Sequence, residues 1–167
     1  MSLAKTHENY AATWNTPPEW MAWANETLEG YLFDPCPANW SGHIDGLTTT
    51  WGINTYLNHP GSRGSTAKWW MAAMNHLSMP RTKLIWCAFS PEQPRHMHPH
   101  PRTIPGWMIE PRARIGFIWG GPDTVLKNGK LRKHGDRCKS PGQQTIFWSS
   151  VEPAATPEPC VITRTGL

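Results

Sequence analysis

Two stretches of apolar residues recur at helical spacing and predict helices over residues 17–29 and 65–79. The first begins with a capping-box pattern, in which Thr16 precedes Glu19 by three residues. Pro17 between them is suited to the first helical position, because it has no N–H to leave unbonded. We therefore expect Thr16 to cap the first helix, over residues 17–29. The second helix is expected over residues 65–79.

Continuous apolar runs predict the strands. Short runs rich in β-branched and aromatic residues occupy 31–33, 53–57, 84–89, 114–119 and 144–149. The run at 84–89 is not interrupted by polar residues, which is typical of a strand covered on both faces. Because a predicted helix separates 53–57 from 84–89, these strands are expected to be adjacent and parallel in the middle of the sheet. The pattern predicts an α/β fold, with a mixed or mostly parallel sheet flanked by helices.

The length of 167 residues fits one domain. Residues 1–13 are polar and are expected to form an arm, and the domain is expected to span residues 14–150. Residues 151–167 are rich in proline and threonine, which predicts a weakly ordered tail. The proline-rich stretch 90–107 is expected to form an ordered loop or lid, because proline at this density excludes helix.

The net charge is +4, and much of the positive charge lies in a single run around the turn signal Asn128-Gly129. This basic run consists of Lys127, Lys130, Arg132, Lys133, Arg137 and Lys139. Such a run can follow a phosphate backbone, or it can be a solvated hairpin. The four cysteines have no zinc-finger spacing, and no signal peptide or long apolar run is present. We expect a cytoplasmic protein with free thiols and no membrane contact.

Two polar residues follow predicted strands, at the strand ends where open α/β sheets bind ligands. Asn58 begins a polar, glycine-containing loop after strand 53–57 and is the first candidate for a functional residue. Asp34 follows strand 31–33, where a carboxylate can bind a ribose, or where it can form an Asx turn with its own backbone. The 11 tryptophans exceed the needs of a core this size, so some are expected to line a cleft where a flat ligand stacks.

Three alternating histidines, His96, His98 and His100, are a further candidate site. They share one face of an extended chain and could bind a metal. No carboxylate or cysteine completes the set nearby, so a solvated loop or a phosphate contact is the alternative. The predicted site therefore contains no metal.

In their order and spacing, these motifs resemble the phage-type Dam family of DNA N6-adenine methyltransferases over roughly residues 14–150. That family opens with W-x-T-P, here Trp14-Asn15-Thr16-Pro17, and continues with an L-D motif, here Phe33-Asp34-Pro35-Cys36. A D-G-L motif follows, here Asp45-Gly46-Leu47. The family's N-P-P-Y then corresponds to Asn58-His59-Pro60-Gly61 in this chain.

The resemblance implies a single-domain, Rossmann-like methyltransferase fold that binds S-adenosylmethionine and DNA. The residues that it places at the cofactor are Trp14, Thr16, Pro17 and Asp34. The residues that it places at the catalytic centre are Asn58, His59 and Pro60. The positions expected to contact the substrate base are Gly61, Trp69 and Trp70.

This chain has Asn58-His59-Pro60-Gly61 where the family has N-P-P-Y. The difference matters because the exocyclic amine of adenine is a poor nucleophile. In the family, an Asn or Asp oxygen and a backbone carbonyl accept its two N–H groups, which turns the lone pair toward the methyl donor. An aromatic residue stacks on the flipped base. Here Asn58 keeps the side-chain acceptor and His59 offers a carbonyl, but Gly61 has no ring. Losing one stack weakens base binding by roughly 1–3 kcal/mol, unless a tryptophan substitutes, for which the candidates are Trp40, Trp69 and Trp70.

Three functional hypotheses follow. The chain is a divergent DNA adenine methyltransferase of the cytoplasm, or of a host cell's cytoplasm if a phage encodes it. Alternatively, His59 marks altered chemistry on another substrate, still with S-adenosylmethionine. In the third hypothesis the domain has lost catalysis and serves as a nucleic-acid or protein-binding module. A preserved cofactor pocket favours the first two, and a blocked pocket favours the third.

Overall fold

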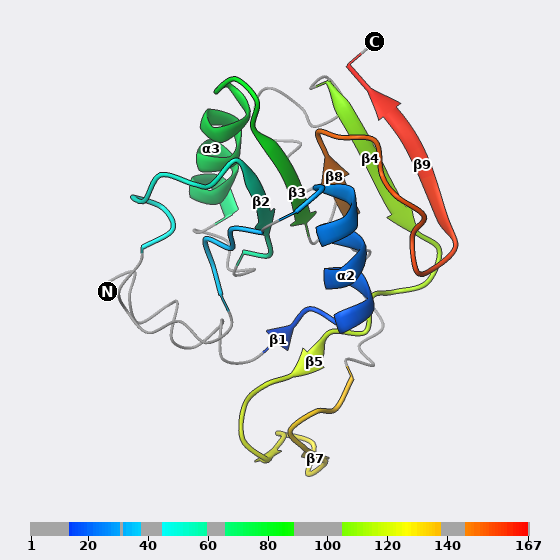
Figure 1. Ribbon diagram of the computed structural model, residues 1–167. Helices are drawn as coiled ribbons and strands as arrows, with labels where there is room; N and C mark the ends of the chain where they lie inside the picture. The colour runs from blue at the N-terminus through cyan, green and yellow to red at the C-terminus, as the bar shows by residue number, and fades with distance from the viewer. Residues whose placement is uncertain are drawn as a thin grey trace.

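The computed structural model describes residues 14–30, 32–37, 45–59, 66–88, 105–137 and 146–166. Its centre is a five-stranded sheet with the order β2-β3-β8-β4-β9 (Figure 1). The strands are β2 (Asn54–Leu57), β3 (Lys83–Ala88), β4 (Gly106–Pro111), β8 (Ile146–Ser149) and β9 (Cys160–Thr165). β2 and β3 are adjacent and parallel, as predicted, but β2 is the first strand of this order rather than a central one, and the other neighbouring pairs are antiparallel. Phe33 adds a parallel bridge to Thr55 on the outer side of β2.

Helices α2 (Pro18–Thr27) and α3 (Thr66–Leu77) cover opposite faces of this sheet (Figure 1). Successive residues of β3 alternate between the two faces, because side chains in a strand point to opposite sides. Ile85 and Cys87 pack in the cluster with α2, whereas Leu84 and Trp86 pack in the cluster with α3. The prediction that this strand is covered on both faces is therefore confirmed.

The start of α2 differs from the predicted capping box. The N-cap residue is Pro17 and makes no side-chain capping bond, while Pro18 is the first helical residue. Glu19 does not reach back to the helix end, because its carboxylate accepts a hydrogen bond from Arg137 Nη1 at 2.8 Å. The Thr16 hydroxyl bonds to the Tyr56 hydroxyl instead. The expectation that Thr16 caps the helix is therefore wrong.

The predicted strand 114–119 is shorter than expected. Only Ile118–Trp119 forms a strand, β5, which pairs with β1 (Trp14–Asn15). A tight turn precedes it, since the Phe117 N–H donates to the Ile115 carbonyl at 3.0 Å. That turn uses the backbone groups which a longer strand would need.

The expectation of a weakly ordered tail is wrong for residues 160–165. This segment forms β9 and pairs with β4 along six residues, from Gly106 opposite Thr165 to Pro111 opposite Cys160. Its sequence, CVITRT, is rich in β-branched residues, which favour a strand. The preceding prolines obscured that signal.

The turn at Asn128-Gly129 joins β6 (Thr124–Val125) to β7 (Leu131–Arg132), as predicted. Gly129 has a φ of 77°, a left-handed conformation that glycine adopts without strain. This hairpin lies at the bottom of Figure 1, away from the central sheet. In the described part of the chain, the parallel pairings are β2 with β3 and the Phe33 bridge. A Rossmann-like methyltransferase fold thus stays a prediction.

Candidate functional site

Asp34 and Asn58 follow adjacent parallel segments and therefore lie at the same edge of the sheet. The bridge between Phe33 and Thr55 aligns the two segments, with the Tyr56 N–H donating to the Phe33 carbonyl at 2.9 Å. Asp34 comes directly after this bridge, and Asn58 comes directly after β2. The structure thus brings together the two residues that the strand ends singled out.

A chain of hydrogen bonds connects Thr16, Tyr56 and Asn58. The hydroxyls of Thr16 and Tyr56 are 2.9 Å apart, and Asn58 Nδ2 donates to Thr16 Oγ1 at 3.4 Å. With Nδ2 facing Thr16, the Asn58 Oδ1 atom is the acceptor of this amide. Burial raises the pKa of the Tyr56 phenol, and the nearby Cys87 and Asp34 raise it further. The phenol therefore stays protonated and acts as a neutral hydrogen-bonding group.

The Asp34 side chain combines an Asx turn with a perturbed acidity. Its Oδ1 atom accepts a hydrogen bond from the Cys36 N–H at 2.7 Å, the local turn considered above as an alternative to ligand binding. Burial raises the pKa of the Asp34 carboxyl to about 6, although the bond to Cys36 opposes this shift. The pKa of the Cys36 thiol rises to about 12, because of burial and then the charge of Asp34. Asp34 can therefore change its ionisation near neutral pH, whereas Cys36 stays a thiol.

The D-G-L segment packs against the turn that holds Asp34. A Cβ atom on Gly46 would lie 1.9 Å from the Pro35 carbonyl oxygen, so only glycine fits this approach. Two further bonds brace the segment. Trp51 Nε1 donates to the Gly46 carbonyl at 2.6 Å, and Asp45 Oδ1 accepts the Leu47 N–H at 3.0 Å. The D-G-L segment and the turn that holds Asp34 are therefore in direct contact in the structure.

Trp14 and Pro17, the other predicted cofactor residues, flank Thr16 in the chain. The Trp14 ring meets the Trp119 ring edge to face with centroids 5.3 Å apart. The Arg132 guanidinium lies over both rings, 4.9 Å from the Trp14 centroid and 5.0 Å from that of Trp119. Pro17 is buried, and its carbonyl accepts the first helical hydrogen bonds of α2. Trp14 and Pro17 therefore have packing roles that hold Thr16 in place.

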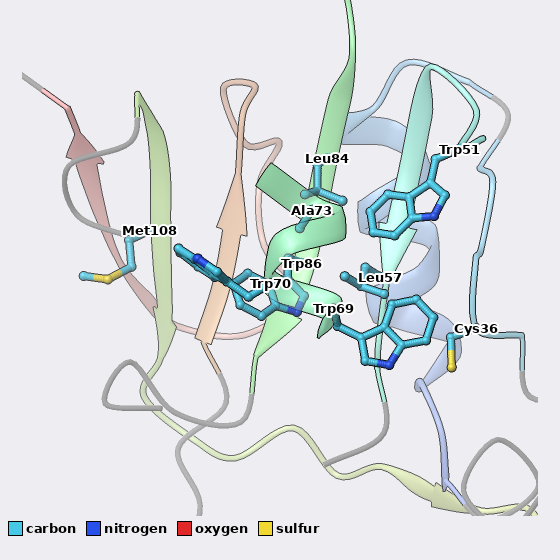
Figure 2. Close-up of a cluster of buried hydrophobic side chains, with 9 residues drawn as sticks. All are labelled: Cys36, Trp51, Leu57, Trp69, Trp70, Ala73, Leu84, Trp86 and Met108. Atoms are coloured by element: carbon cyan, nitrogen blue, oxygen red, sulfur yellow. The ribbon is translucent and has the colours of Figure 1, made fainter. Parts of the chain in front are cut away.

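Trp69 and Trp70 lie on the α3 side of the sheet, in one cluster with Leu84 and Trp86 (Figure 2). His59 lies on the same side, because its ring is close to that of Trp86. The His59 ring centroid is 5.6 Å from that of Trp86, and the Trp70 centroid is 5.0 Å from it. Trp69 and Trp70 are only 1% and 0% exposed, so the expectation that one of them stacks on a base is wrong. These tryptophans also lie on the opposite side of the sheet from Asn58. Side chains alternate along a strand, so Tyr56 and Asn58, two positions apart, share one side, whereas His59 is directed to the side of α3.

Tyr56 belongs to this site, although its position in the sequence did not mark it as a candidate. It belongs to a strand predicted from apolar residues, and its hydroxyl contacts only become visible in three dimensions. The period of two along a strand was the available signal, since it places Tyr56 and Asn58 on one side. Several other candidates lie outside the described residues: Trp40, Pro60, Gly61, His96, His98 and His100. Within the described ranges, no group of His, Cys, Asp or Glu is arranged to hold a metal ion.

Comparison with other proteins neither supports nor contradicts the resemblance of the motifs. No protein-family model matches the chain, and neither the curated proteins nor the solved structures give a match. Neither helix in the described part of the chain is long and apolar enough to cross a bilayer. The functional interpretation therefore depends on the geometry of Thr16, Asp34, Tyr56 and Asn58.

Proposed function

We propose that this protein is an S-adenosylmethionine-dependent DNA adenine N6-methyltransferase of the cytoplasm. The observation that carries the proposal is the orientation of the Asn58 amide. Its Nδ2 atom is bonded to Thr16, so its Oδ1 atom is left to accept a hydrogen bond from a substrate. This is the acceptor that the exocyclic amine of adenine needs in order to become nucleophilic.

In the proposed reaction, Asn58 Oδ1 accepts one N–H of the adenine amine. The backbone carbonyl of His59, the next residue, accepts the second. Together these bonds draw the nitrogen lone pair out of conjugation with the ring and direct it toward the methyl donor. Tyr56 and Thr16 keep the Asn58 amide in this orientation before substrate arrives, so no reorganisation is needed during the reaction.

The proposed cofactor supplies an electrophilic methyl group, and Asp34 fits the role of binding its ribose. Among the described residues, Asp34 accepts one hydrogen bond, at Oδ1 from the Cys36 N–H. Its second carboxylate oxygen is therefore left for a ribose hydroxyl. Above pH 6 the group is ionised and accepts such a bond most strongly. The alternative function, a binding module without catalysis, is favoured by the burial of Trp69 and Trp70, which removes two candidate replacements for the missing aromatic ring.

The test combines calorimetry with S-adenosylmethionine and an assay for labelled methyl transfer to DNA. Asn58→Ala should bind the cofactor like the parent but lower turnover at least about a hundredfold, the scale for losing one preorganised polar partner. Asn75→Ala, on an exposed position of α3, is the matched control and should leave both unchanged. If the parent binds the cofactor but transfers no methyl group to DNA, the adenine methyltransferase proposal fails, and altered chemistry on another substrate or a binding module takes its place.

A further inference from the structure

We propose that the β6–β7 hairpin is the surface through which this protein binds the phosphate backbone of duplex DNA. The proposal deepens and rests on the methyltransferase function, because it names the contact surface for that substrate. Residues 123–137 contain five lysines and arginines and two aspartates, a net +3 within a chain whose total is +4. Most of the net positive charge of the protein is therefore carried by this one projection.

Three lysines of the hairpin are available to a partner. Lys127, Lys130 and Lys133 are all exposed, and none of them forms an ion pair within the described part of the chain. The two hairpin carboxylates are instead bonded to backbone. Asp123 Oδ1 accepts the His134 N–H at 2.9 Å, and Asp136 Oδ2 accepts the Lys133 N–H at 2.8 Å. The lysine ammonium groups are thus free to approach phosphates.

The hairpin is anchored to the rest of the protein, unlike a solvated loop. Arg132 lies over the rings of Trp14 and Trp119, and Arg137 pairs with Glu19 at 2.8 Å. The Gly135 N–H also donates to the Trp119 carbonyl at 2.8 Å. Two basic residues are therefore used to fix the hairpin in place, while the three lysines stay exposed. A preorganised arrangement of charge loses less entropy when it binds.

An apolar pair lies between these lysines. Val125 and Leu131 are directly opposite in the β6–β7 register and are 68% and 52% exposed. Exposed apolar side chains among basic residues suit a nucleic-acid groove, where they contact sugars and base steps while lysines contact phosphates. The exposure of Val125 and Leu131 is unexplained by packing within the described residues.

The position of the hairpin agrees with the site at Asn58. Trp14, which Arg132 covers, is two residues before Thr16, and Thr16 accepts the Asn58 hydrogen bond. In Figure 1 the hairpin lies at the end of the molecule toward which β2 and β3 point. DNA bound along the hairpin would therefore lie at the edge of the sheet where Asn58 and Asp34 are found.

The test measures binding of a fluorescent duplex to the full chain by anisotropy, without cofactor, as salt is raised from about 50 to 200 mM. Lys127→Gln/Lys130→Gln/Lys133→Gln should bind at least about tenfold more weakly, with a log-log salt slope smaller by about 2–3, since each phosphate contact contributes roughly 0.9. The control is Lys68→Gln/Arg81→Gln/Arg112→Gln, which removes the same charge from exposed positions outside the hairpin. It should stay within about twofold of the parent.

Three outcomes would overturn the proposal. They are equal losses in the two triple variants, an unchanged slope in the lysine variant, and a parent that binds no duplex. A separate measurement tests binding to vesicles that contain phosphatidylserine. If the three lysines are needed for vesicle binding but not for duplex binding, the hairpin contacts a membrane surface and the DNA assignment is wrong. A parent that binds DNA through the hairpin without transferring methyl groups would refute only the methyltransferase function.

Discussion

Replacing Asp34 by asparagine separates its local turn from its charge. Asparagine has nearly the same shape, and its Oδ1 atom can still accept the Cys36 N–H, so the turn is preserved. What the variant loses is a carboxyl group whose pKa is raised by burial from 3.8 to about 6. Any pH-dependent difference from the parent therefore reports the buried charge.

The sign follows from the direction of the shift. A carboxyl with a raised pKa in the folded state contributes most to stability below its unfolded pKa, and this contribution is lost as pH rises through about 6. A shift of this size corresponds to about 3 kcal/mol between the two limits. Asp34→Asn does not titrate, so it should become more stable than the parent as pH rises. About 2 kcal/mol of that difference should appear between roughly pH 4.5 and 8.

Urea unfolding of parent and variant across this pH range measures the difference directly. Other titrating groups act equally in both proteins and cancel. Calorimetry with S-adenosylmethionine at about pH 7.5 should show binding at least about tenfold weaker in Asp34→Asn, because a charge-assisted hydrogen bond is lost. A stability difference that stays flat with pH would refute the buried carboxylate. Equal cofactor binding would instead refute its assignment to the ribose.

Two further variants test the roles of polar and aromatic neighbours. Thr16→Val should lower both methyl transfer and the free energy of unfolding, the latter by about 1–3 kcal/mol, because the buried Tyr56 hydroxyl loses its Thr16 partner; Thr16→Ser, which keeps the hydroxyl, should retain turnover in the same assay. Trp70→Ala should reduce the free energy of unfolding by about 3–5 kcal/mol in urea titrations, as expected for a core tryptophan. If the Trp70→Ala protein is as stable as the parent but binds DNA poorly, Trp70 contacts the substrate and its assignment to the core is wrong.

The elements predicted correctly are those whose signal is local. The apolar run of β3 required cover on both faces, and the Asn128-Gly129 dipeptide required a tight turn. β9 was missed because its pairing with β4 joins residues about fifty positions apart, and the prolines before it favoured disorder. The capping box failed because tertiary partners for Thr16 and Glu19 outcompeted the helix end.

The candidate site was predictable where it depends on strand ends. Asn58 and Asp34 each follow a short apolar run, and parallel pairing then places both at one edge. The tryptophans of α3 were not predictable in the same way, because helical spacing shows that Trp69 and Trp70 differ in direction but not which direction meets the sheet. Both are in fact buried. Arg132 over Trp14 likewise joins segments more than a hundred residues apart.

The energetics of Asp34 bear on the choice between an enzyme and a binding module. An Asx turn alone could be made by asparagine, with no ionisable group to bury. An aspartate in the same place opposes folding at neutral pH by about 3 kcal/mol, a large part of the 5–15 kcal/mol that stabilises a typical domain. A role for the negative charge accounts for this, and hydrogen-bond donors from a ligand would recover the lost stability on binding. The burial of Asp34 near Tyr56 therefore fits the proposal that this domain binds S-adenosylmethionine rather than serving only as a binding module.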